Sequence, residues 1–578
     1  MIFNHNQKRG ASALPANQLV AYFCAEYAIS DTLPIYSGGL GVLAGDIVQE
    51  AAERSLNFVA IGLFYKLGYF HQRVDASGQH ESVTQINPVD APLELVLDEK
   101  GETLLIEVPY HERKIVAQVW KYKVGPVNLY LLDTDHWKNS EADRQITNQL
   151  YSGDQPHRIA QELVLGVGGF RLLKALKIEP TIYHMNEGHS AFLSLELTEQ
   201  IMRTQKVSLE AAIAQARSHL VFTNHTLVAA GNDAFPHEMI RYYLGSYAFE
   251  SGLGIDTILG LGNADQPGTF SMTMLALRMA RVSNAVSRLH AEKALSLWPG
   301  FPLSDVTNGV HLPAWIAPEM QALYTEAASD WRLYASDAKA WKPIRNIPYE
   351  KVWETHVELR KKMLEEVYKR TGVQLQDDVL TVVWARRFAT YKRPDLLFSD
   401  LERLKKLLFS SDKPIQIIVS GKSHPADGQG KAIIQAIENL SNEDLKHRAV
   451  FVDDYSITLA KYLVSGADVW LNTPIYGLEA SGTSGMKASA NGVVQFTTPD
   501  GWAHEVDWYG MGYTLPLDQA ETGIYDLFEK EIIPTFYRTG KNGIPELWVA
   551  MMKETIAAVS PQFSSQRMLN DYVDLYLS

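Results

Sequence analysis

Short hydrophobic runs alternate along the chain with longer stretches in which hydrophobic positions recur every three or four residues. The runs are rich in β-branched and aromatic residues, as in LVAYFCAEY (19–27) and VLTVVWARR (379–387), and they end in polar or glycine-rich turns. Such runs predict buried strands, and the amphipathic stretches between them predict helices. The alternation therefore predicts an α/β fold with mainly parallel sheets.

Two series of predicted strands divide the chain. The first series ends at a segment with several Pro and Gly residues, Leu303 to Met320, and the second series follows it. A junction of this kind favours a domain boundary, so we expect one Rossmann-like domain in residues 1–315 and another in residues 316–578. Open parallel sheets bind ligands at the carboxyl ends of their strands, where His, Glu, Asn and Arg gather in this sequence. Two such domains facing each other across a central cleft are the simplest arrangement.

The composition narrows the class of protein. A chain of 578 residues, 46% hydrophobic and 21% charged, is typical of a globular protein with at least two domains. Its net charge of −14 argues against a general nucleic-acid or anionic-membrane surface, so any anion site must be local. The single cysteine, Cys24, excludes an internal disulfide and fits a reducing compartment. We find neither a signal-peptide pattern nor an apolar run long enough to cross a bilayer, and we therefore expect a cytoplasmic protein.

A glycine-rich turn, YSGGLGVLAGD, precedes a predicted helix in the first series. Gly38, Gly39 and Gly41 would let backbone amides approach an anion or a sugar hydroxyl closely. The spacing matches neither a Walker loop nor the dinucleotide-binding pattern. The turn therefore either contacts a ligand or serves tight packing alone.

Cations gather where the strand predicted over residues 379–387 ends. Arg386, Arg387, Lys392 and Arg393 surround this turn. In an acidic protein, such a turn makes a concentrated phosphate-binding site. The alternative is a solvated basic turn, but cations in the first turn of a helix are slightly unfavourable, which favours the phosphate site.

Histidines at the ends of predicted strands raise the question of a metal. The spacings of His184, His189, His225 and His311 match no closed zinc motif, and Cys24 cannot complete one, so we expect no metal. A ligand with many hydroxyl groups needs paired hydrogen-bond donors and acceptors. The side chains that suit such a ligand are Asn186, Glu187, His189 and Asn308.

The segment EASGTSGMKASANG (479–492) joins a hydroxyl- and glycine-rich loop to a predicted helix with one lysine. Amides and hydroxyls of residues 481–485 could hold a phosphate, and Lys487 lies just inside the helix. The lysine could be a point charge for that phosphate, a Schiff-base partner for pyridoxal phosphate, or part of an ordinary capped helix. The residues alone leave these three interpretations open.

Six segments resemble, in their order along the chain, motifs of the α-glucan phosphorylases, the family of glycogen, starch and maltodextrin phosphorylases. They are SGGLGVLAGD, YHMNEGHSAF, FTNHTLVAAGNDAFP, TNGVHLPAWIAPE, ARRFATYKRP and EASGTSGMKASANG. The resemblance runs from about Ala21 to Val506 and is closest to the shorter bacterial forms. It implies a GT-B fold with the active site in the central cleft. It also implies reversible phosphorolysis of terminal α-1,4-linked glucose from glycogen or maltodextrin, which releases α-D-glucose 1-phosphate with retention.

The resemblance further implies a cofactor and partners. The cofactor would be pyridoxal 5′-phosphate, and the partners would be an α-1,4-glucan or maltooligosaccharide and inorganic phosphate or glucose 1-phosphate. A homodimer is compatible with the family. We expect neither a nucleic-acid nor a membrane partner.

The matching motifs imply a role for each site residue. Lys487 would bind pyridoxal 5′-phosphate covalently, and the other cofactor-binding residues would be Thr483, Ser484, Gly485, Arg386, Trp315 and Tyr455. Arg387 and Lys392 would hold the substrate phosphate, and with Lys487 and His189 they form the expected catalytic set. The residues implied to bind the glucose or its acceptor are Gly38, Gly39, Glu187, His189, Asn308, Glu479, Ser481 and Gly482.

In the mechanism that the resemblance implies, the cofactor acts through its phosphate group. The substrate phosphate passes a proton to the leaving oxygen and then bonds to the anomeric carbon. Arg387 and Lys392 would offset the repulsion between the two phosphate groups.

Four positions depart from the family pattern: Arg281, Ala285, Ala28 and Ser37. Arg281 stands where a sugar-contacting histidine is usual, and we expect Arg281 to lie at the cleft as a substrate-binding residue that alters sugar contacts. Two alternatives remain: a nucleotide-sugar glucosyltransferase of glycogen-synthase type and a non-catalytic glucan-binding homologue. Lys487 argues against the first, and the pair of Arg387 and Lys392 argues against the second.

Overall fold

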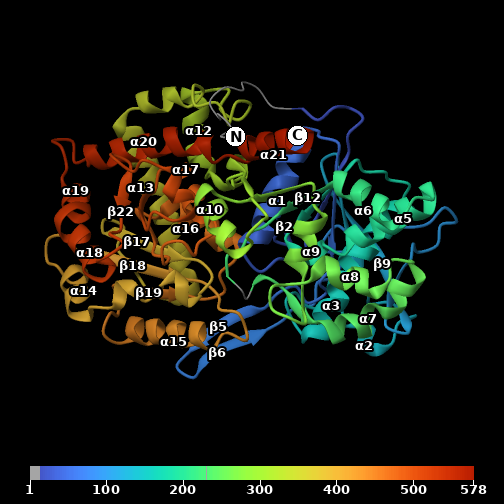
Figure 1. Ribbon diagram of the computed structural model, residues 1–578. Coiled ribbons are helices and arrows are strands. Elements are labelled where there is room, and N and C mark those ends of the chain that lie inside the picture. Colours follow the sequence, from blue (N-terminus) through green and yellow to red (C-terminus); the bar gives the residue numbers. More distant parts are fainter. Residues whose placement is uncertain (1–12, 229–230) are drawn as a thin grey trace. The chain divides into compact units, whose positions relative to one another are not determined.

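The computed structural model describes residues 13–228 and 231–578, which form two compact units (Figure 1). We call them the N-unit and the C-unit. The N-unit consists of residues 13–70, Val83–Val306 and Leu569–Ser578, and the C-unit consists of His71–Ser82 and Thr307–Met568. The sequence suggested one junction at residue 315. The division instead falls between Val306 and Thr307. In addition, His71–Ser82 belongs to the C-unit, and Leu569–Ser578 belongs to the N-unit.

A large mixed sheet forms the centre of the N-unit. Its strand order is β16-β15-β12-β11-β1-β4-β10-β9-β7, with β8 paired to β9. The strands from β16 to β10 are parallel, whereas β7, β8 and β10 pair with β9 in the antiparallel sense. The bounds are β1 Val20–Phe23, β4 Phe58–Leu63, β7 Glu94–Leu95, β8 Ile106–Tyr110, β9 Arg113–Val124, β10 Val127–Asp133, β11 Ile182–Asn186, β12 Leu220–Thr223, β15 Val282–Ala285 and β16 Ser304–Asp305.

Helices and two small hairpins complete the N-unit. The hairpins pair β2 (Tyr27–Ser30) with β3 (Leu33–Ile35) and β13 (Ala234–Pro236) with β14 (Thr269–Ser271). The helices are α1 Gly39–Glu53, α2 Glu141–Arg144, α3 Gln155–Leu163, η1 Val164–Gly168, α4 Gly169–Ala175, η2 Gly188–Ser190, α5 Leu193–Gln205, α6 Leu209–Ser218, α7 His237–Glu250, α8 Ile255–Gly262, α9 Met272–Met279 and α10 Arg288–Leu297.

The C-unit is built on an all-parallel sheet with the order β19-β18-β17-β20-β21-β22. These strands are β17 Leu380–Ala385, β18 Ile415–Ser420, β19 Ala449–Val452, β20 Val469–Asn472, β21 Val494–Thr497 and β22 Gly512–Thr514, and a separate hairpin pairs β5 (His71–Asp75) with β6 (Gly78–Ser82). The helices are α11 Leu312–Trp315, α12 Pro318–Ala327, η4 Lys342–Asn346, α13 Tyr349–Thr371, η5 Thr390–Lys392, η6 Leu396–Phe398, α14 Leu401–Leu408, α15 Gly428–Asn442, α16 Ile457–Gly466, α17 Ser484–Ala490, η7 Gly501–Glu505, α18 Ala520–Leu527, η8 Phe528–Ile532, α19 Ile533–Tyr537 and α20 Glu546–Gln562.

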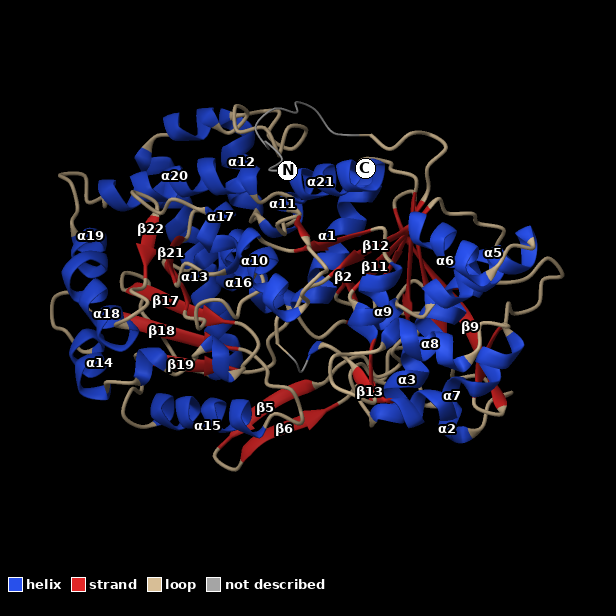
Figure 2. Ribbon diagram, in the orientation of Figure 1, coloured by secondary structure: helices blue, strands red, loops and turns tan. Residues whose placement is uncertain are grey.

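The hydrophobic runs form the inner strands of both sheets. Strands β4, β17 and β18 are buried at every position. A parallel strand covered on both faces reads as a continuous hydrophobic run, and Figure 2 shows helices around the strands of each unit. The expectation of an α/β protein with mainly parallel sheets is confirmed.

The last helix, α21 (Ser565–Leu577), begins in the C-unit and ends in the N-unit. Its N-unit part brings two buried tyrosines to the large sheet, because the Tyr576 hydroxyl lies 2.7 Å from Nδ1 of His184 and the ring of Tyr572 packs on the same imidazole. Separately, among the described residues, no helix combines the length and the hydrophobicity that a membrane span requires.

Candidate functional site

The basic turn of the C-unit closes around one carboxylate. Arg386 follows β17, Lys392 ends the short helix η5, and both side chains are buried. The Glu479 carboxylate accepts hydrogen bonds from Nη2 of Arg386 at 2.6 Å and from Nζ of Lys392 at 2.8 Å. Burial alone would raise the pKa of Glu479, but the charges of Arg386 and Lys392, with a smaller effect of Arg387, lower it to about 2. Three cations therefore surround one permanent anion, and the group keeps a net positive charge.

Two further features of this turn suit an anion. Arg387 is exposed, and Nε of Arg386 is buried without a hydrogen-bond partner in the described part of the chain. A buried donor of this kind is costly unless a ligand accepts from it. The geometry thus supports the concentrated anion site that the sequence predicts here.

Hydrogen bonds between the turn at Lys392 and the loop after β20 fix the position of Lys392. Arg393 adopts a left-handed conformation with φ of 44°, and its guanidinium donates to the carbonyls of Thr473 at 2.8 Å and Pro474 at 3.0 Å. In return, the Thr473 hydroxyl lies 3.0 Å from the Lys392 carbonyl and 2.9 Å from that of Arg393. The loop after β20 therefore holds the turn after β17.

Lys487 lies on α17 beside an aromatic ring. Its Nζ atom is 3.8 Å from the centroid of the Trp315 ring, and both side chains are buried. The Asn491 amide donates to the carbonyls of Trp315 and Lys487, at 2.9 Å each, and so ties α11 to α17. The predicted pair of Trp315 and Lys487 is brought together, and Asn491 is an additional residue that positions both.

The start of α17 is packed tightly. Thr483 is its N-cap residue, and the Ser484 hydroxyl accepts a hydrogen bond from the indole N–H of Trp470 at 3.2 Å. A side chain at Gly485 would lie 2.7 Å from the amide oxygen of Gln495, so this position requires glycine. Because the Ser484 hydroxyl only accepts a hydrogen bond from Trp470, it can still donate its own proton to a ligand.

The remaining predicted residues of the C-unit lie in loops. Ser481 is buried, and Gly482 has a φ of 77°, which favours glycine. Asn308 is also buried, and its Oδ1 atom has no hydrogen-bond partner among the described residues. Tyr455 is half-buried and follows Asp454, which has a φ of 51°.

In the N-unit, a buried glutamate organises the glycine-rich turn. Gly38 is the N-cap residue of α1, and Gly39 begins the helix. The Glu26 carboxylate accepts from the backbone N–H of Ser37 at 2.6 Å and of Gly38 at 3.3 Å, and its other oxygen accepts from the Tyr151 hydroxyl at 2.8 Å. Neither Glu26 nor Tyr151 belongs to a recognisable spacing pattern, so the sequence does not predict their roles.

Glu187 lies at the carboxyl end of β11 in an unusual conformation. Its φ of 72° and ψ of 170° fall in a region that is nearly restricted to glycine. The side chain is buried and accepts hydrogen bonds from the backbone N–H of His225 at 2.6 Å and of Gly188 at 3.3 Å. Burial outweighs these hydrogen bonds and raises the pKa of Glu187 to about 8.

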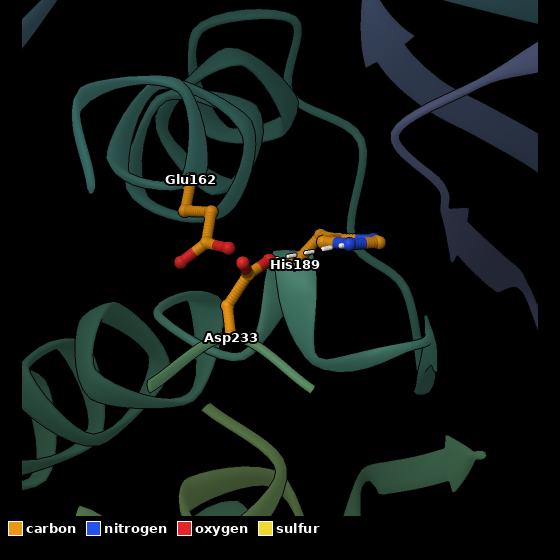
Figure 3. A group of neighbouring side chains, drawn as sticks. All are labelled: Glu162, His189 and Asp233. Carbon is orange, nitrogen blue, oxygen red and sulfur yellow. Dashed lines mark ion pairs between the residues drawn. The ribbon is translucent and has the colours of Figure 1, made fainter. Parts of the chain in front are cut away.

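His189 lies two residues further along the chain, in η2, beside a cluster of charged residues that the sequence does not predict. Its Nε2 atom is 3.5 Å from Oδ2 of Asp233, which Nη2 of Arg158 also contacts at 2.5 Å. Glu162 of α3 completes the cluster (Figure 3). Burial lowers the pKa of His189 to about 4. The one signal in the sequence is that Arg158 and Glu162 lie four residues apart, which places them on the same face of a predicted helix.

Arg281 lies apart from the other residues that the motifs assign to the substrate. It is exposed and precedes the amino end of β15, where its guanidinium donates to the Tyr576 carbonyl at 3.2 Å. Because β11, β12 and β15 are parallel, this end of the sheet is opposite the carboxyl ends that carry Glu187 and His189. This position does not favour the expectation that Arg281 binds the sugar, since a match to a motif position gives no information about the end of the strand on which it falls.

The chain matches known proteins along most of its length. A family model described as carbohydrate phosphorylase matches residues 260–508. Glycogen phosphorylase of Mycobacterium tuberculosis is 38% identical over 98% of this chain and 71% of its own length. Maltodextrin phosphorylase of Thermococcus litoralis is 40% identical over 97% and 70%, and glycogen phosphorylase of Aquifex aeolicus is 37% identical over 97% and 86%.

The fold and the site define an α/β enzyme with a buried lysine and a concentrated cationic turn. With relatives at this level of identity, the chain belongs to the carbohydrate phosphorylase family, as a member of its α-glucan phosphorylases. Enzymes of this family use pyridoxal phosphate.

Proposed function

We propose that this chain catalyses the reversible phosphorolysis of terminal α-1,4-linked glucose from glycogen or maltodextrin. Inorganic phosphate is the second substrate, and α-D-glucose 1-phosphate is released with retention. The observation that carries the proposal is the 37–40% identity to glycogen and maltodextrin phosphorylases over at least 97% of this chain.

The cationic turn is the proposed phosphate site. Arg387 and Lys392 hold the substrate phosphate, and Arg386 directs its unpartnered Nε atom to a second anion. Two phosphate groups at close range repel each other by several kcal/mol, on the order expected at low effective dielectric. Glu479 neutralises part of the local positive charge and fixes the directions of Arg386 and Lys392.

The residues around Lys487 fit pyridoxal 5′-phosphate. Lys487 supplies an amine beside the flat ring of Trp315, and the orphan donor of Arg386 suits the phosphate of the cofactor. The other residues proposed to hold it are Thr483, Ser484, Gly485 and Tyr455. When bound, the cofactor supplies a phosphate group that can exchange a proton with the substrate phosphate.

The substrate phosphate carries out the bond changes. It gives a proton to the glycosidic oxygen, the bond from that oxygen to the anomeric carbon breaks, and a phosphate oxygen bonds to the same face of that carbon. The cations stabilise the phosphate while the sugar carries positive charge. The residues proposed to orient the glucose and its acceptor are Gly38, Gly39, Glu187, His189, Asn308, Glu479, Ser481 and Gly482.

We further propose that the two units are the halves of a GT-B fold, that the reaction takes place between them, and that the enzyme acts in the cytoplasm as a homodimer. The family membership supports the GT-B arrangement.

The purified protein tests the function. We expect glucose 1-phosphate from maltoheptaose and inorganic phosphate, and about one pyridoxal phosphate per chain, which borohydride reduction fixes on Lys487. Transfer of glucose from a nucleotide sugar without phosphorolysis would favour the synthase alternative. Absence of the cofactor after reconstitution, or its attachment to another lysine, would refute the proposal.

A further inference from the structure

A buried carboxyl group, that of Glu162, and a half-buried one, that of Asp233, face each other beside His189. Figure 3 shows the carboxyl groups of Glu162 and Asp233 turned towards each other, with the imidazole of His189 beyond Asp233. The ligand atoms of these three residues lie within 4.8 Å of one another. Glu162 is 2% exposed, and both of its carboxyl oxygens lack a hydrogen-bond donor in the described part of the chain.

These contacts distribute the charge unequally. An ionised carboxylate that is buried without a donor is strongly disfavoured, and two adjacent carboxylates cannot both ionise without a large penalty. Arg158 pairs with Asp233 at 2.5 Å and therefore keeps the negative charge on Asp233. Burial, and then the charge of Asp233, raise the pKa of Glu162 well above its usual value. Glu162 is thus the neutral partner, and its carboxyl group can donate a hydrogen bond to Asp233.

The backbone holds Asp233 in place. Its carbonyl accepts from the N–H of Met272 at 3.0 Å, and Arg158 also lies over the ring of Tyr151, 5.1 Å from the centroid. The charged carboxylate lies 3.5 Å from Nε2 of His189. A carboxylate favours the imidazole tautomer that turns an N–H towards it. The other ring nitrogen, Nδ1, is buried and has no partner among the described residues.

We propose that Asp233, kept ionised by Arg158 and by the proton of Glu162, is a positioning residue that holds His189 as the Nε2–H tautomer, so that Nδ1 accepts a hydrogen bond from a sugar hydroxyl. This inference rests on the proposed function, because it assigns His189 to the sugar. Asp233 itself touches no substrate in this scheme.

A divalent cation is the competing occupant of the cluster. A glutamate, an aspartate and a histidine within reach of one another could bind zinc. However, the guanidinium of Arg158 already contacts the same oxygen of Asp233 that faces His189, and a metal there would repel it. The charge of Asp233 is instead balanced by Arg158 and by a hydrogen bond from neutral Glu162, so the cluster needs no metal.

The wild-type enzyme allows a test that needs no variant. After labelling of histidine with ¹⁵N, the His189 ring is assigned by comparison with a His189→Asn sample. We expect a neutral ring protonated on Nε2 between pH 6 and 8. A ring protonated on Nδ1, or a charged ring, would overturn the proposal whether or not phosphorolysis is detected. Saturable zinc binding that Glu162→Gln abolishes would also overturn it.

Variants supply the second test. Gln mimics a protonated glutamate, so we expect Glu162→Gln to lower kcat/KM by less than about fivefold, whereas Asp233→Asn should lower it by at least ~30-fold and lose the Nε2–H signal. Cofactor content, which depends on the C-unit, serves as the control for folding. If the parent enzyme phosphorolyses glucan and Asp233→Asn retains both the tautomer and the activity, the inference fails while the proposed function stands.

Discussion

Glu187 combines two unfavourable features in a single residue. Its backbone occupies a region that costs on the order of 1–3 kcal/mol for a residue with a side chain. Its carboxyl group is buried, and its pKa is raised to about 8. Strain and a perturbed pKa at the same position are typical of a residue retained for function at the expense of stability.

The raised pKa of Glu187 predicts the direction of a pH effect. A raised carboxyl pKa means that the folded chain binds the proton more tightly than the unfolded chain. Stability from this group is therefore fully present below pH 4.5 and is lost as the pH rises towards 8. We expect Glu187→Gln to raise the free energy of unfolding by about 4 kcal/mol at pH 7.5 and by less than about 1 kcal/mol at pH 5. Urea denaturation at both pH values measures this.

The exposed Glu443→Gln variant serves as the control, and it should match the parent protein at both pH values. Identical pH dependence of the parent and of Glu187→Gln would show that Glu187 is ionised in the folded protein.

Removal of the buried cation Lys392 should separate catalysis from cofactor binding. Lys392→Ala leaves Glu479 paired with Arg386, so the fold of the turn should survive. We expect turnover to fall by at least ~100-fold while cofactor content stays near that of the parent, and the same for Arg387→Ala. Steady-state glucose 1-phosphate formation and cofactor absorbance measure the two effects. The exposed Lys413→Ala variant is the control, and normal turnover of Lys392→Ala would contradict the assignment.

The observed place of Arg281 changes the prediction for this residue. Because its guanidinium contacts the Tyr576 carbonyl at an exposed edge, we expect Arg281→His to match the parent within about twofold in kcat/KM for every donor and acceptor sugar, a difference of ~0.4 kcal/mol. A larger change confined to one sugar would restore Arg281 to the substrate site.

For single residues, the sequence predicts those that stand in motifs better than those that act through contacts with distant parts of the chain. Lys487, Arg386 and Glu479 stand in segments whose composition already indicates chemistry. Glu26 and Asp233 carry no such signal, because each gains its importance from contacts with residues far away along the chain: Glu26 with Tyr151, and Asp233 with Arg158. A single charged residue in a loop is usually solvated, so only the folded arrangement identifies these two.

Among the elements, the short helix η5 is held in place by a residue of another loop, Thr473. The Thr473 hydroxyl contacts the carbonyls of Lys392 and Arg393 and also lies 3.2 Å from the indole N–H of Trp384. Thr473→Val keeps the shape but leaves these buried groups unpaired, which costs about 1–3 kcal/mol. We therefore expect lower stability in urea and a lower kcat.

Thr355→Val on α13 is a matched control, because the Thr355 hydroxyl bonds only to its own helix at Lys351 in the contacts described. If Thr473→Val unfolds at the same urea concentration as this control, the hydrogen bonds of the Thr473 hydroxyl do not stabilise the turn.

The inner strands could be predicted from their hydrophobic runs, whereas the β5–β6 hairpin could not be placed. Residues 71–82 are mostly polar, and their place in the C-unit depends on side chains such as Asp454, which binds the N–H of Gln72 at 3.2 Å, and Lys431, which pairs with Glu81 at 2.7 Å. Such polar contacts leave no periodic trace in a sequence.

For the whole molecule, the N-unit depends on residues that follow the C-unit in the sequence. His184 is fully buried, and burial lowers its pKa to about 3, so it stays neutral. Thr223 accepts from its Nε2–H while donating to Asn284, and the Tyr576 hydroxyl therefore donates to Nδ1. We expect Tyr576→Phe to destabilise the N-unit by about 1–3 kcal/mol.

Hydrogen exchange measures this effect locally. The amides of β11 and β12 should exchange faster in Tyr576→Phe, whereas those of β17 and β18 should not. The fully exposed Tyr509→Phe variant should change neither set. Equal acceleration in both sheets would show that the hydroxyl has no local role.

The crossing of α21 also bears on how the protein is made. A ribosome adds about 5–20 residues per second, and domains usually fold in order as they emerge. Here the large sheet of the N-unit is synthesised roughly 10 to 50 seconds before Tyr572 and Tyr576, since residues Thr307–Met568 of the C-unit are translated in between. During that interval His184 lacks its partner, and the part of the sheet that α21 will cover is open to water. We therefore expect the N-unit to reach its full stability only after synthesis of α21 is complete.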